Sequence, residues 1–275
     1  MDFHHLRTDT AFDLDLTLSS GQFFRWKPYK SGYLIQDAQK CFIIWQRNSD
    51  LEYTSVCGKV SSQYLTDFFR LDDDLEQIFS RWNDSSVRKA FSRYKGLRLI
   101  RQDPWECALS FLCSMASNIP RITQNINTLA TRFGASTQTP YGSFSRLPTP
   151  EQLAEVSLED LYNAGVGFRA KYLYGLAKSG LHLESLRDED YKTAKATLLS
   201  IKGIGDKVAD CILLFSLDHL EAFPVDTWIM QALQTWIFPD LSGSPAQFAE
   251  QARKHFGAFA GYAQQYLFHH ARAIL

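Results

Sequence analysis

The chain reads LLSIKGIGDKVADCI at residues 198–212. Apolar residues at helical spacing lie on both sides of Gly203-Ile204-Gly205, so we expect one helix to end before this turn and a second to begin at Asp206. Two glycines allow a sharp turn and expose backbone N–H groups at a helix N-terminus, where anions bind. The pattern predicts a helix-hairpin-helix near residues 193–215 that binds nucleic-acid phosphates, although an ordinary corner between two helices fits it as well.

Two polar residues near this turn are candidates for covalent chemistry. Lys207 lies close to the start of the second helix, with Cys211 one turn later on the same face. The helix dipole disfavours a cation there and so favours the uncharged amine that a nucleophile needs. In FPVDTWIM at residues 223–230, Asp226 precedes an apolar helix. It is either a plain helix N-cap or a carboxylate that supports a cationic intermediate.

The N-terminal part of the chain consists of short β-branched and aromatic runs separated by turn residues, which predicts an antiparallel meander. No helix-length segment separates these runs, so a parallel sheet is excluded. After Gly58 the apolar period becomes helical, interrupted by a polar loop at 135–145. The fold class is therefore α+β, with the sheet first and the helices after it. The expected strands are 12–18, 23–28, 32–36, 41–46 and 51–56.

Composition limits the class of protein. The 275 residues are 45% hydrophobic and 14% aromatic, enough for the cores of one or two domains, so a disordered chain is excluded. The 29 basic and 30 acidic side chains nearly balance, so nucleic-acid binding requires a local basic face, such as residues 82–101. Five scattered cysteines without a CxxC pair, and no signal peptide or membrane span, predict an intracellular protein with reduced thiols and no metal site.

Five separated segments resemble the helix-hairpin-helix, Gly/Pro-Asp family of base-excision DNA glycosylases, and within it the 8-oxoguanine DNA glycosylases. GIGDKVADC at residues 203–211, followed by PVDT at 224–227, resembles the motif that names the family. The resemblance implies a TBP-like antiparallel sheet domain at residues 1–98, packed on a mainly α-helical glycosylase domain at residues 99–275. The other matching segments are SGQFFRW (20–26), DPWEC to SNIPRI (103–122), GVGFRAKY (165–172) and GYAQ with Phe268 (261–268).

The resemblance also implies a role for each matching residue. Lys207 is the expected nucleophile, and Asp226 stabilises the positive charge that develops on the sugar. Gly21 offers its carbonyl to the N7–H that 8-oxoguanine has and guanine lacks. Phe268 and Cys211 enclose the flipped base, and Gln264 binds its Watson–Crick edge. The expected DNA contacts are Asn118 in the vacated duplex position, Arg121 and Arg169 at the estranged cytosine, Phe168 as a wedge, and Lys202, Gly203 and Gly205 of the hairpin.

The implied activity is that of a bifunctional glycosylase. It flips out 8-oxoguanine, excises it through a lysine Schiff base, and nicks the abasic site by β-elimination. The implied partner is double-stranded DNA with oxidised guanine, preferably opposite cytosine. We expect a monomer without membrane contact, in the cytoplasm and nucleoid of a bacterium or the nucleus of a eukaryote. No cofactor is required, and a monovalent cation at the hairpin stays open.

Two other functions are compatible with parts of the sequence. A monofunctional alkylpurine glycosylase shares the implied fold and the aspartate, but it uses water and lacks the lysine. A non-catalytic helix-hairpin-helix DNA-binding protein explains the hairpin but not Lys207, Asp226 and Gly21 together. The chain also departs from the family pattern: Trp228 stands where certain relatives have histidine, residues 114–118 contain a single asparagine, and His269 to Arg272 lack an acidic residue.

Overall fold

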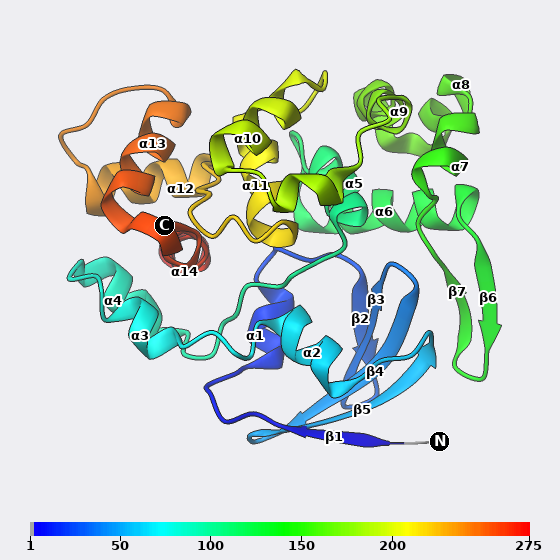
Figure 1. Cartoon of the computed structure of the whole chain (residues 1–275), viewed down its shortest axis with the longest axis horizontal. Coiled ribbons are helices and arrows are strands. Elements are labelled where there is room, and N and C mark those ends of the chain that lie inside the picture. Colours follow the sequence, from blue (N-terminus) through cyan, green and yellow to red (C-terminus); the bar gives the residue numbers. More distant parts are fainter. Residues whose placement is uncertain (1–2) are drawn as a thin grey trace.

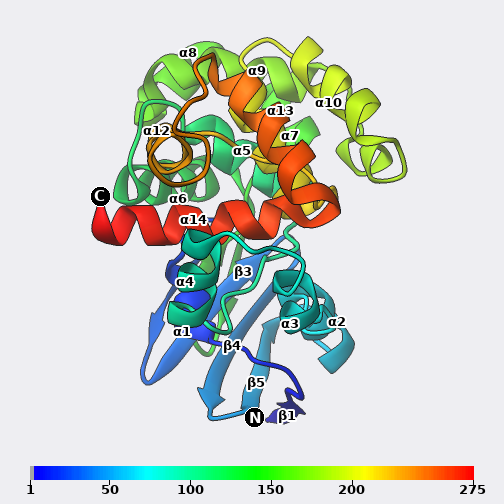
Figure 2. The same ribbon diagram turned by 90° about the vertical axis from the view of Figure 1, so that its left-hand side faces the viewer.

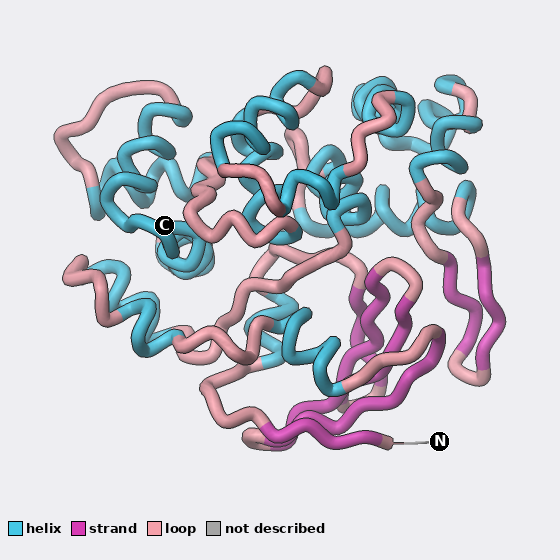
Figure 3. Tube along the Cα trace, in the orientation of Figure 1, coloured by secondary structure: helices cyan, strands magenta, loops and turns pink. Residues whose placement is uncertain are grey.

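The N-terminal sheet has five antiparallel strands in the order β1-β5-β4-β3-β2 in this computed structural model, which describes residues 3–275. Tight turns join β2 to β3, β3 to β4 and β4 to β5. Lys30, Ala38 and Asn48 in these turns have φ angles of 50°, 49° and 57°. The predicted meander and the α+β class are confirmed (Figure 1, Figure 3). The strands are β1 (His4–Arg7), β2 (Trp26–Tyr29), β3 (Gly32–Asp37), β4 (Lys40–Arg47) and β5 (Asp50–Cys57).

A helix, not a strand, forms in the segment 12–18. In α1 (Leu14–Ser19) the Asp13 side chain caps the helix by accepting a hydrogen bond from the Leu16 N–H. The apolar-polar alternation of this segment was misleading, because the buried residues Leu14, Thr17 and Leu18 also have the i, i+3, i+4 spacing of a helix face. α1 and α2 (Ser62–Phe69) pack together with the sheet residues Ile35, Phe42, Ile44, Leu51 and Tyr53.

The rest of the chain forms a helical body centred on α5 and α11, which are buried along most of their lengths. Asp103 caps α5 as expected, by accepting a hydrogen bond from the Glu106 N–H. α14 lies at the boundary of the body and contacts both α4 and α12 (Figure 2). None of the helices in residues 3–275 is long and apolar enough to cross a membrane. The helices are α3 (Leu75–Phe79), α4 (Ser85–Arg93), α5 (Pro104–Cys113), α6 (Ile119–Phe133), α7 (Pro150–Glu155), α8 (Leu158–Leu161), α9 (Ala170–Lys178), α10 (Tyr191–Ser200), α11 (Asp206–Ser216), α12 (Thr227–Ala232), α13 (Pro245–Phe256) and α14 (Ala260–Ile274).

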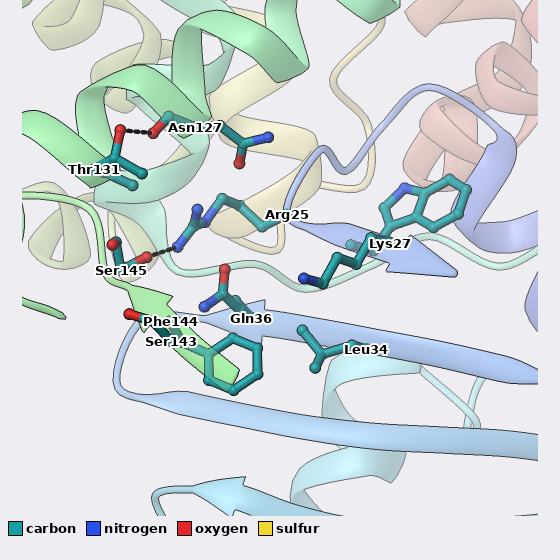
Figure 4. A pocket seen from close by; sticks show the side chains of 11 residues that line it. Arg25, Lys27, Leu34, Gln36, Asn127, Thr131, Ser143, Phe144 and Ser145 are labelled. Atoms are coloured by element: carbon teal, nitrogen blue, oxygen red, sulfur yellow. Dashed lines mark hydrogen bonds between the residues drawn. The ribbon is translucent and has the colours of Figure 1, made fainter. Parts of the chain in front are cut away.

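A second hairpin replaces the predicted polar loop at 135–145. β6 (Ser136–Thr139) and β7 (Gly142–Ser145) pair with each other, although their composition is almost entirely polar. Phe144 is the residue that attaches them, because it packs with Leu34 and Ile43 on the sheet. The Arg25 guanidinium also donates a hydrogen bond of 2.7 Å to the Ser145 carbonyl (Figure 4). The prediction of a loop was wrong because tertiary packing at one aromatic residue outweighs the polar pattern.

The basic stretch at 82–101 forms only part of the face that we expected. Arg88 and the other basic residues of α4 are exposed, whereas Arg98 is fully buried. Arg98 donates hydrogen bonds to the backbone carbonyls of Ala11, Arg70 and Asp73. Its charge is therefore used to satisfy buried carbonyls between the sheet layer and α3, not to attract DNA.

Asp218, two residues after the end of α11, binds three arginines from distant segments. One carboxylate oxygen accepts from Arg70 and from Arg101, the latter at 2.8 Å, and the other accepts from Arg187 at 2.6 Å. Burial opposes ionisation, but these guanidinium groups hold the pKa of Asp218 below its ordinary value. The carboxylate thus connects the end of α2, the segment before α5, and the loop before α10.

A buried group of ionisable residues joins the sheet to the start of α5. Asp37 accepts hydrogen bonds from the Tyr64 hydroxyl (2.7 Å) and the Asp103 N–H (3.0 Å), and burial raises its pKa to about 6. Glu106 lies with one oxygen 3.9 Å from Arg25 Nε. Burial raises the pKa of Glu106 to about 8, and the Arg25 charge opposes this only in part. Glu106 therefore holds a proton at neutral pH.

This buried carboxyl group makes the stability of the protein depend on pH. The pKa of Glu106 is about 8 in the folded chain and 4.5 ordinarily, so its contribution to stability is complete below pH 4.5 and is lost as the pH rises through 8. In the wild-type protein the free energy of unfolding should fall between pH 5 and 8. In Glu106→Gln this fall should be smaller by roughly 2–4 kcal/mol. Urea denaturation at several pH values measures this difference. The exposed control Glu155→Gln should keep the wild-type slope; an equal slope in Glu106→Gln would contradict the assignment.

Candidate active site

One cavity of about 950 Å³ collects side chains from segments that are far apart in the sequence. The sheet layer contributes Gly21 and Phe24, and the helical body contributes the rest of the wall. Lys207, Asp226 and Gly21, which the sequence analysis singled out separately, all line this cavity. The remaining lining residues come from Phe111 of α5, the loop 114–118, the start of α6, the turn before α11 with its first residues, the start of α12, and Phe268 and Arg272 of α14.

Lys207 lies in the first turn of α11 and is half-buried. Its Nζ donates a hydrogen bond of 2.9 Å to the Ser114 hydroxyl, and it lies 4.9 Å from the centre of the Phe111 ring. At this contact the amine is held by a neutral oxygen, so its position does not depend on an ion pair with a carboxylate. An amine with apolar surroundings on one side and an open cavity on the other is arranged for attack on an electrophilic carbon.

The predicted hairpin connects α10 to α11, with the buried Ile204 filling its interior. The Ile204 N–H donates to the Ile201 carbonyl at 3.0 Å, which closes the turn. Gly203 has a φ of +100°, and a Cβ at this position would lie 2.3 Å from the Tyr172 ring. Only glycine fits there without a shift of Tyr172. Gly205 forms the N-cap of α11, and the Lys202 side chain next to the turn is exposed.

Asp226 is a helix N-cap and also lines the cavity. It is the N-cap of α12, and its Oδ1 accepts a hydrogen bond of 2.9 Å from the Ile229 N–H. The residue is half-buried and lines the cavity. A carboxylate fixed by the cap bond stands in the same cavity as the Lys207 amine. The neighbouring Trp228 is 38% exposed and also lines the cavity, at the position where certain relatives have histidine.

Of the residues expected around the base, two line the cavity and two are buried and do not line it. Gly21, with a φ of +83°, is in close contact with its surroundings, because a Cβ there would lie 3.3 Å from Arg272 Nη1 and 3.4 Å from Phe268 Cε1. Gly21 and Phe268 line the cavity directly. Cys211 and Gln264 lie behind its wall, with 2% and 5% exposure.

The two deeper side chains have well-defined chemical states. Burial raises the pKa of Cys211 to about 12, so its side chain is a neutral thiol at neutral pH. Gln264 Nε2 donates to the Pro224 carbonyl at 3.0 Å. Gln264 Oε1 is buried without a hydrogen-bond partner among the described residues. A buried acceptor of this kind is costly unless a ligand supplies the donor.

The expected duplex contacts divide into exposed and buried groups. Asn118 is exposed at the N-terminus of α6, and Arg121 donates to the Gly165 carbonyl at 2.9 Å, close in sequence to Phe168, which is 47% exposed. Arg169, in contrast, is 7% exposed. Its guanidinium donates to the carbonyls of Met115 and Ala116. In this structure Arg169 holds the loop that leads to Asn118.

Ser114 and Arg272 line the cavity and were not among the predicted site residues. Ser114 binds Lys207, but the two are 93 residues apart in sequence, and no local pattern connects them. Arg272 places its guanidinium 5.4 Å from the centre of the Phe268 ring. The helical spacing of four residues between Phe268 and Arg272 is the signal that could have found it. Residues 3–275 contain no group of three or more His, Cys, Asp or Glu side chains that could hold a metal ion.

Comparisons with known proteins agree with this geometry. Residues 5–108 match the family model "8-oxoguanine DNA glycosylase, N-terminal domain". The chain is 34% identical to N-glycosylase/DNA lyase OGG1 of Arabidopsis thaliana, over 95% of this chain and 78% of that protein. It is 30% identical to the probable N-glycosylase/DNA lyase of Methanothermobacter thermautotrophicus, over 95% of this chain and 94% of that protein.

Solved structures give the same result over the full length. The 8-oxoguanine glycosylase/lyase of Clostridium acetobutylicum, in complex with double-stranded DNA containing cytosine opposite 8-oxoguanine, matches with a TM-score of 0.88 and 29% identity, covering 99% of both chains. Its apo-form matches with a TM-score of 0.90 and 30% identity, covering 98% of this chain and 96% of that one. The chain therefore belongs to the 8-oxoguanine DNA glycosylase/lyase family of the helix-hairpin-helix superfamily.

Proposed function

We propose that the chain excises 8-oxoguanine from double-stranded DNA and nicks the resulting abasic site, with Lys207 as the nucleophile. The observation that supports this most directly is the presence of the Lys207 amine, the Asp226 carboxylate and Gly21 in one cavity. A cavity of about 950 Å³ has the size of a small-molecule site and accommodates a flipped nucleotide.

The proposed reaction proceeds through a covalent intermediate. Lys207 Nζ attacks C1′ of the deoxyribose, and the base leaves with the electron pair of the glycosidic bond. Asp226 stabilises the positive charge that develops on the sugar during this step. Loss of a proton from nitrogen and opening of the sugar ring give a Schiff base. Removal of a C2′ proton then expels the 3′ phosphate by β-elimination, which cuts the strand.

Recognition of the oxidised base is proposed for Gly21, Phe268, Cys211 and Gln264. The Gly21 carbonyl accepts from N7–H of 8-oxoguanine, whereas the N7 lone pair of guanine would repel it. The unpartnered Oε1 of Gln264 supports its role, since the Watson–Crick edge of the base carries N–H donors that this buried acceptor lacks. Because Cys211 and Gln264 are buried, the side chains that cover them must shift when the base enters.

The duplex contacts form a second part of the proposal. Asn118 fills the vacated position, Phe168 wedges beside the estranged cytosine, and Arg121 with Arg169 donate to that base. Arg169 has to exchange its bonds to the loop carbonyls for bonds to DNA. The turn Lys202–Gly205 binds backbone phosphates, and a monovalent cation at its carbonyls belongs to the same proposal. The Clostridium complex with cytosine opposite the lesion supports this choice of opposite base.

The proposal extends to the oligomeric state, the domain boundaries and the location of the protein. We propose that a monomer suffices, because one chain supplies every lining residue named above. We further propose residues 1–98 and 99–275 as the two domains, and a location with the DNA substrate, the nucleoid or the nucleus. Phe24 of the first domain and α3 and α4 pack into the core of the helical body, so the two units share an extensive interface.

The covalent intermediate can be trapped. Incubation with a duplex containing 8-oxoguanine opposite cytosine in the presence of borohydride should give a protein–DNA adduct, detected by denaturing electrophoresis. We expect Lys207→Gln to lose the adduct and to slow base release by roughly 10³-fold or more, whereas the exposed control Lys192→Gln keeps both. Base release without any adduct would favour the alkylpurine type of glycosylase, and binding without turnover the non-catalytic protein.

Asp226→Asn separates chemistry from binding. Asparagine is an equally good N-cap, so the stability of the variant should stay close to that of the wild type. Loss of the negative charge should lower the single-turnover rate of base excision by roughly 10²-fold while the affinity for lesion DNA is kept. Quenched-flow measurement of base release, together with a filter-binding titration, tests both parts. An unchanged excision rate would remove Asp226 from the mechanism.

Ser114 is proposed as a positioning residue for the Lys207 amine. Deleting its hydroxyl in Ser114→Ala should reduce kcat about tenfold and leave KM within about twofold, because the amine loses its 2.9 Å hydrogen bond to this hydroxyl. Ser114→Thr keeps a hydroxyl and should restore most of the rate. Equal activities of the alanine and threonine variants would show that the bond does not position the nucleophile.

A further inference from the structure

Two cysteines face each other across neighbouring strands of the sheet. In the antiparallel pair of β4 and β5, Cys41 lies opposite Cys57, and Phe42 lies opposite Ser55. The register therefore shifts between Cys41 and Phe42, and this bulge brings Cys57 to the position opposite Cys41. Directly opposed residues of an antiparallel pair point to the same side of the sheet, with Cα atoms about 4.5–5.5 Å apart. A disulfide requires Cα separations of about 4.4–6.8 Å, so this pairing is suited to one.

Both cysteines line the same small cavity, together with Gln39 and Arg146. Its volume is about 10 Å³, enough for one molecule of the size of water. Cys57 is half-buried and can be reached from solvent, whereas Cys41 is 3% exposed. A small, uncharged oxidant can therefore reach the Cys57 sulfur, whereas the Cys41 sulfur is buried next to it.

Arg146 places a positive charge beside Cys57. Its Nη2 lies 3.2 Å from the Cys57 sulfur and donates a hydrogen bond to it. Partially exposed cysteines next to cations are the usual sites of oxidation, and the thiolate is the form that reacts. Burial raises the pKa of Cys41 to about 12, so Cys41 keeps its proton. The pair thus consists of an accessible sulfur next to a cation and a protected thiol, an arrangement found at oxidation-sensitive cysteine pairs.

We propose that Cys41 and Cys57 form a disulfide when the protein meets hydrogen peroxide. The Cys57 thiolate attacks one peroxide oxygen, the O–O bond breaks, and hydroxide leaves, so that Cys57 becomes a sulfenic acid. The Cys41 sulfur then attacks the Cys57 sulfur, the S–OH bond breaks, and the departing hydroxide takes the Cys41 proton as water. One peroxide is reduced to two waters, counting the proton that neutralises the first hydroxide, and two thiols are oxidised to one disulfide.

The other three cysteines do not share these properties. Cys107, Cys113 and Cys211 are buried in the helical body, with 0%, 0% and 2% exposure. Burial raises the pKa of each thiol, which lowers its reactivity. Cys107 Sγ lies 4.0 Å from the Cys211 carbonyl, which makes this pair the main competitor for a disulfide. Its lack of solvent access predicts that it stays reduced.

Oxidation of this pair would also reach the β6–β7 hairpin. Arg146 directly follows β7, and its guanidinium contacts both Gln39 and Cys57 on the sheet. A disulfide sulfur carries no negative charge, so this contact of Arg146 weakens when the bond forms. Phe144, packed near Leu34, and the Arg25–Ser145 bond then remain as anchors of the hairpin (Figure 4). We therefore expect faster amide hydrogen exchange at residues 136–145 in the oxidised protein.

The test uses the full chain and hydrogen peroxide in modest excess at pH 7.5. After alkylation of free thiols with N-ethylmaleimide in denaturant, the number of labelled cysteines should fall from five to three. Trypsin cuts after Lys40, Arg47 and Lys59, so the two cysteines lie in separate peptides, 41–47 and 48–59. Mass spectrometry without reduction should find these two peptides joined, and dithiothreitol should separate them.

Matched variants make the assignment specific. Cys57→Ser should abolish the joined peptides, and Cys113→Ala should leave them unchanged. Arg146→Met should slow the loss of thiols about tenfold, whereas Arg47→Met, at the end of β4 with its side chain 75% exposed, should not. Five free thiols after peroxide treatment, a stable sulfinic acid on Cys57 without a linked peptide, or a Cys107–Cys211 link instead would each overturn the proposal.

Discussion

A single carboxylate, Asp218, holds together the parts of the molecule that must stay in register for a cavity to exist. It accepts hydrogen bonds from Arg70 at the end of α2, Arg101 in the segment before α5, and Arg187 in the loop before α10. Because Asp218 lies two residues after the end of α11, these bonds anchor the C-terminal end of the helix whose first turn carries Lys207. The position of the amine thus depends on a charge cluster at the far end of the same helix.

The cavity is divided between the two layers of the fold. Gly21 and Phe24 come from the sheet layer, whereas Lys207 and Asp226 come from the helical body. The proposed contact of Gly21 with the base and the proposed nucleophile Lys207 therefore come from different layers. Buried polar groups form hydrogen bonds across the interface between them: Gln102 Nε2 donates to the Gln22 carbonyl at 2.7 Å, and Gln265 Nε2 donates to the Ser20 carbonyl at 3.2 Å. Such bonds are directional, so they fix the relative placement of the layers more strictly than apolar packing alone.

Local chemistry explains which features could be predicted from the sequence. The three central strands follow from β-branched and aromatic runs between turn residues, and the cap at Asp103 follows from helix-start signals; both appear in the structure. The prediction of a strand at 12–18 was wrong because these seven residues fit a strand period and a helix period equally well. The β6–β7 hairpin, the burial of Arg98 and the bond from Ser114 to Lys207 could not be predicted, because each depends on a partner distant in sequence.

The loop before α6 has a mechanical consequence. Ser114, which holds the amine, and Asn118, which is exposed on the outer side, are only four residues apart, and Arg169 clamps the carbonyls of Met115 and Ala116 between them. Any displacement of Asn118 or of Arg169 must be taken up within this short, strained span, where Ala116 has a φ of +45°. The proposed insertion of Asn118 into a duplex would therefore be coupled, through Ser114, to the position of the Lys207 amine.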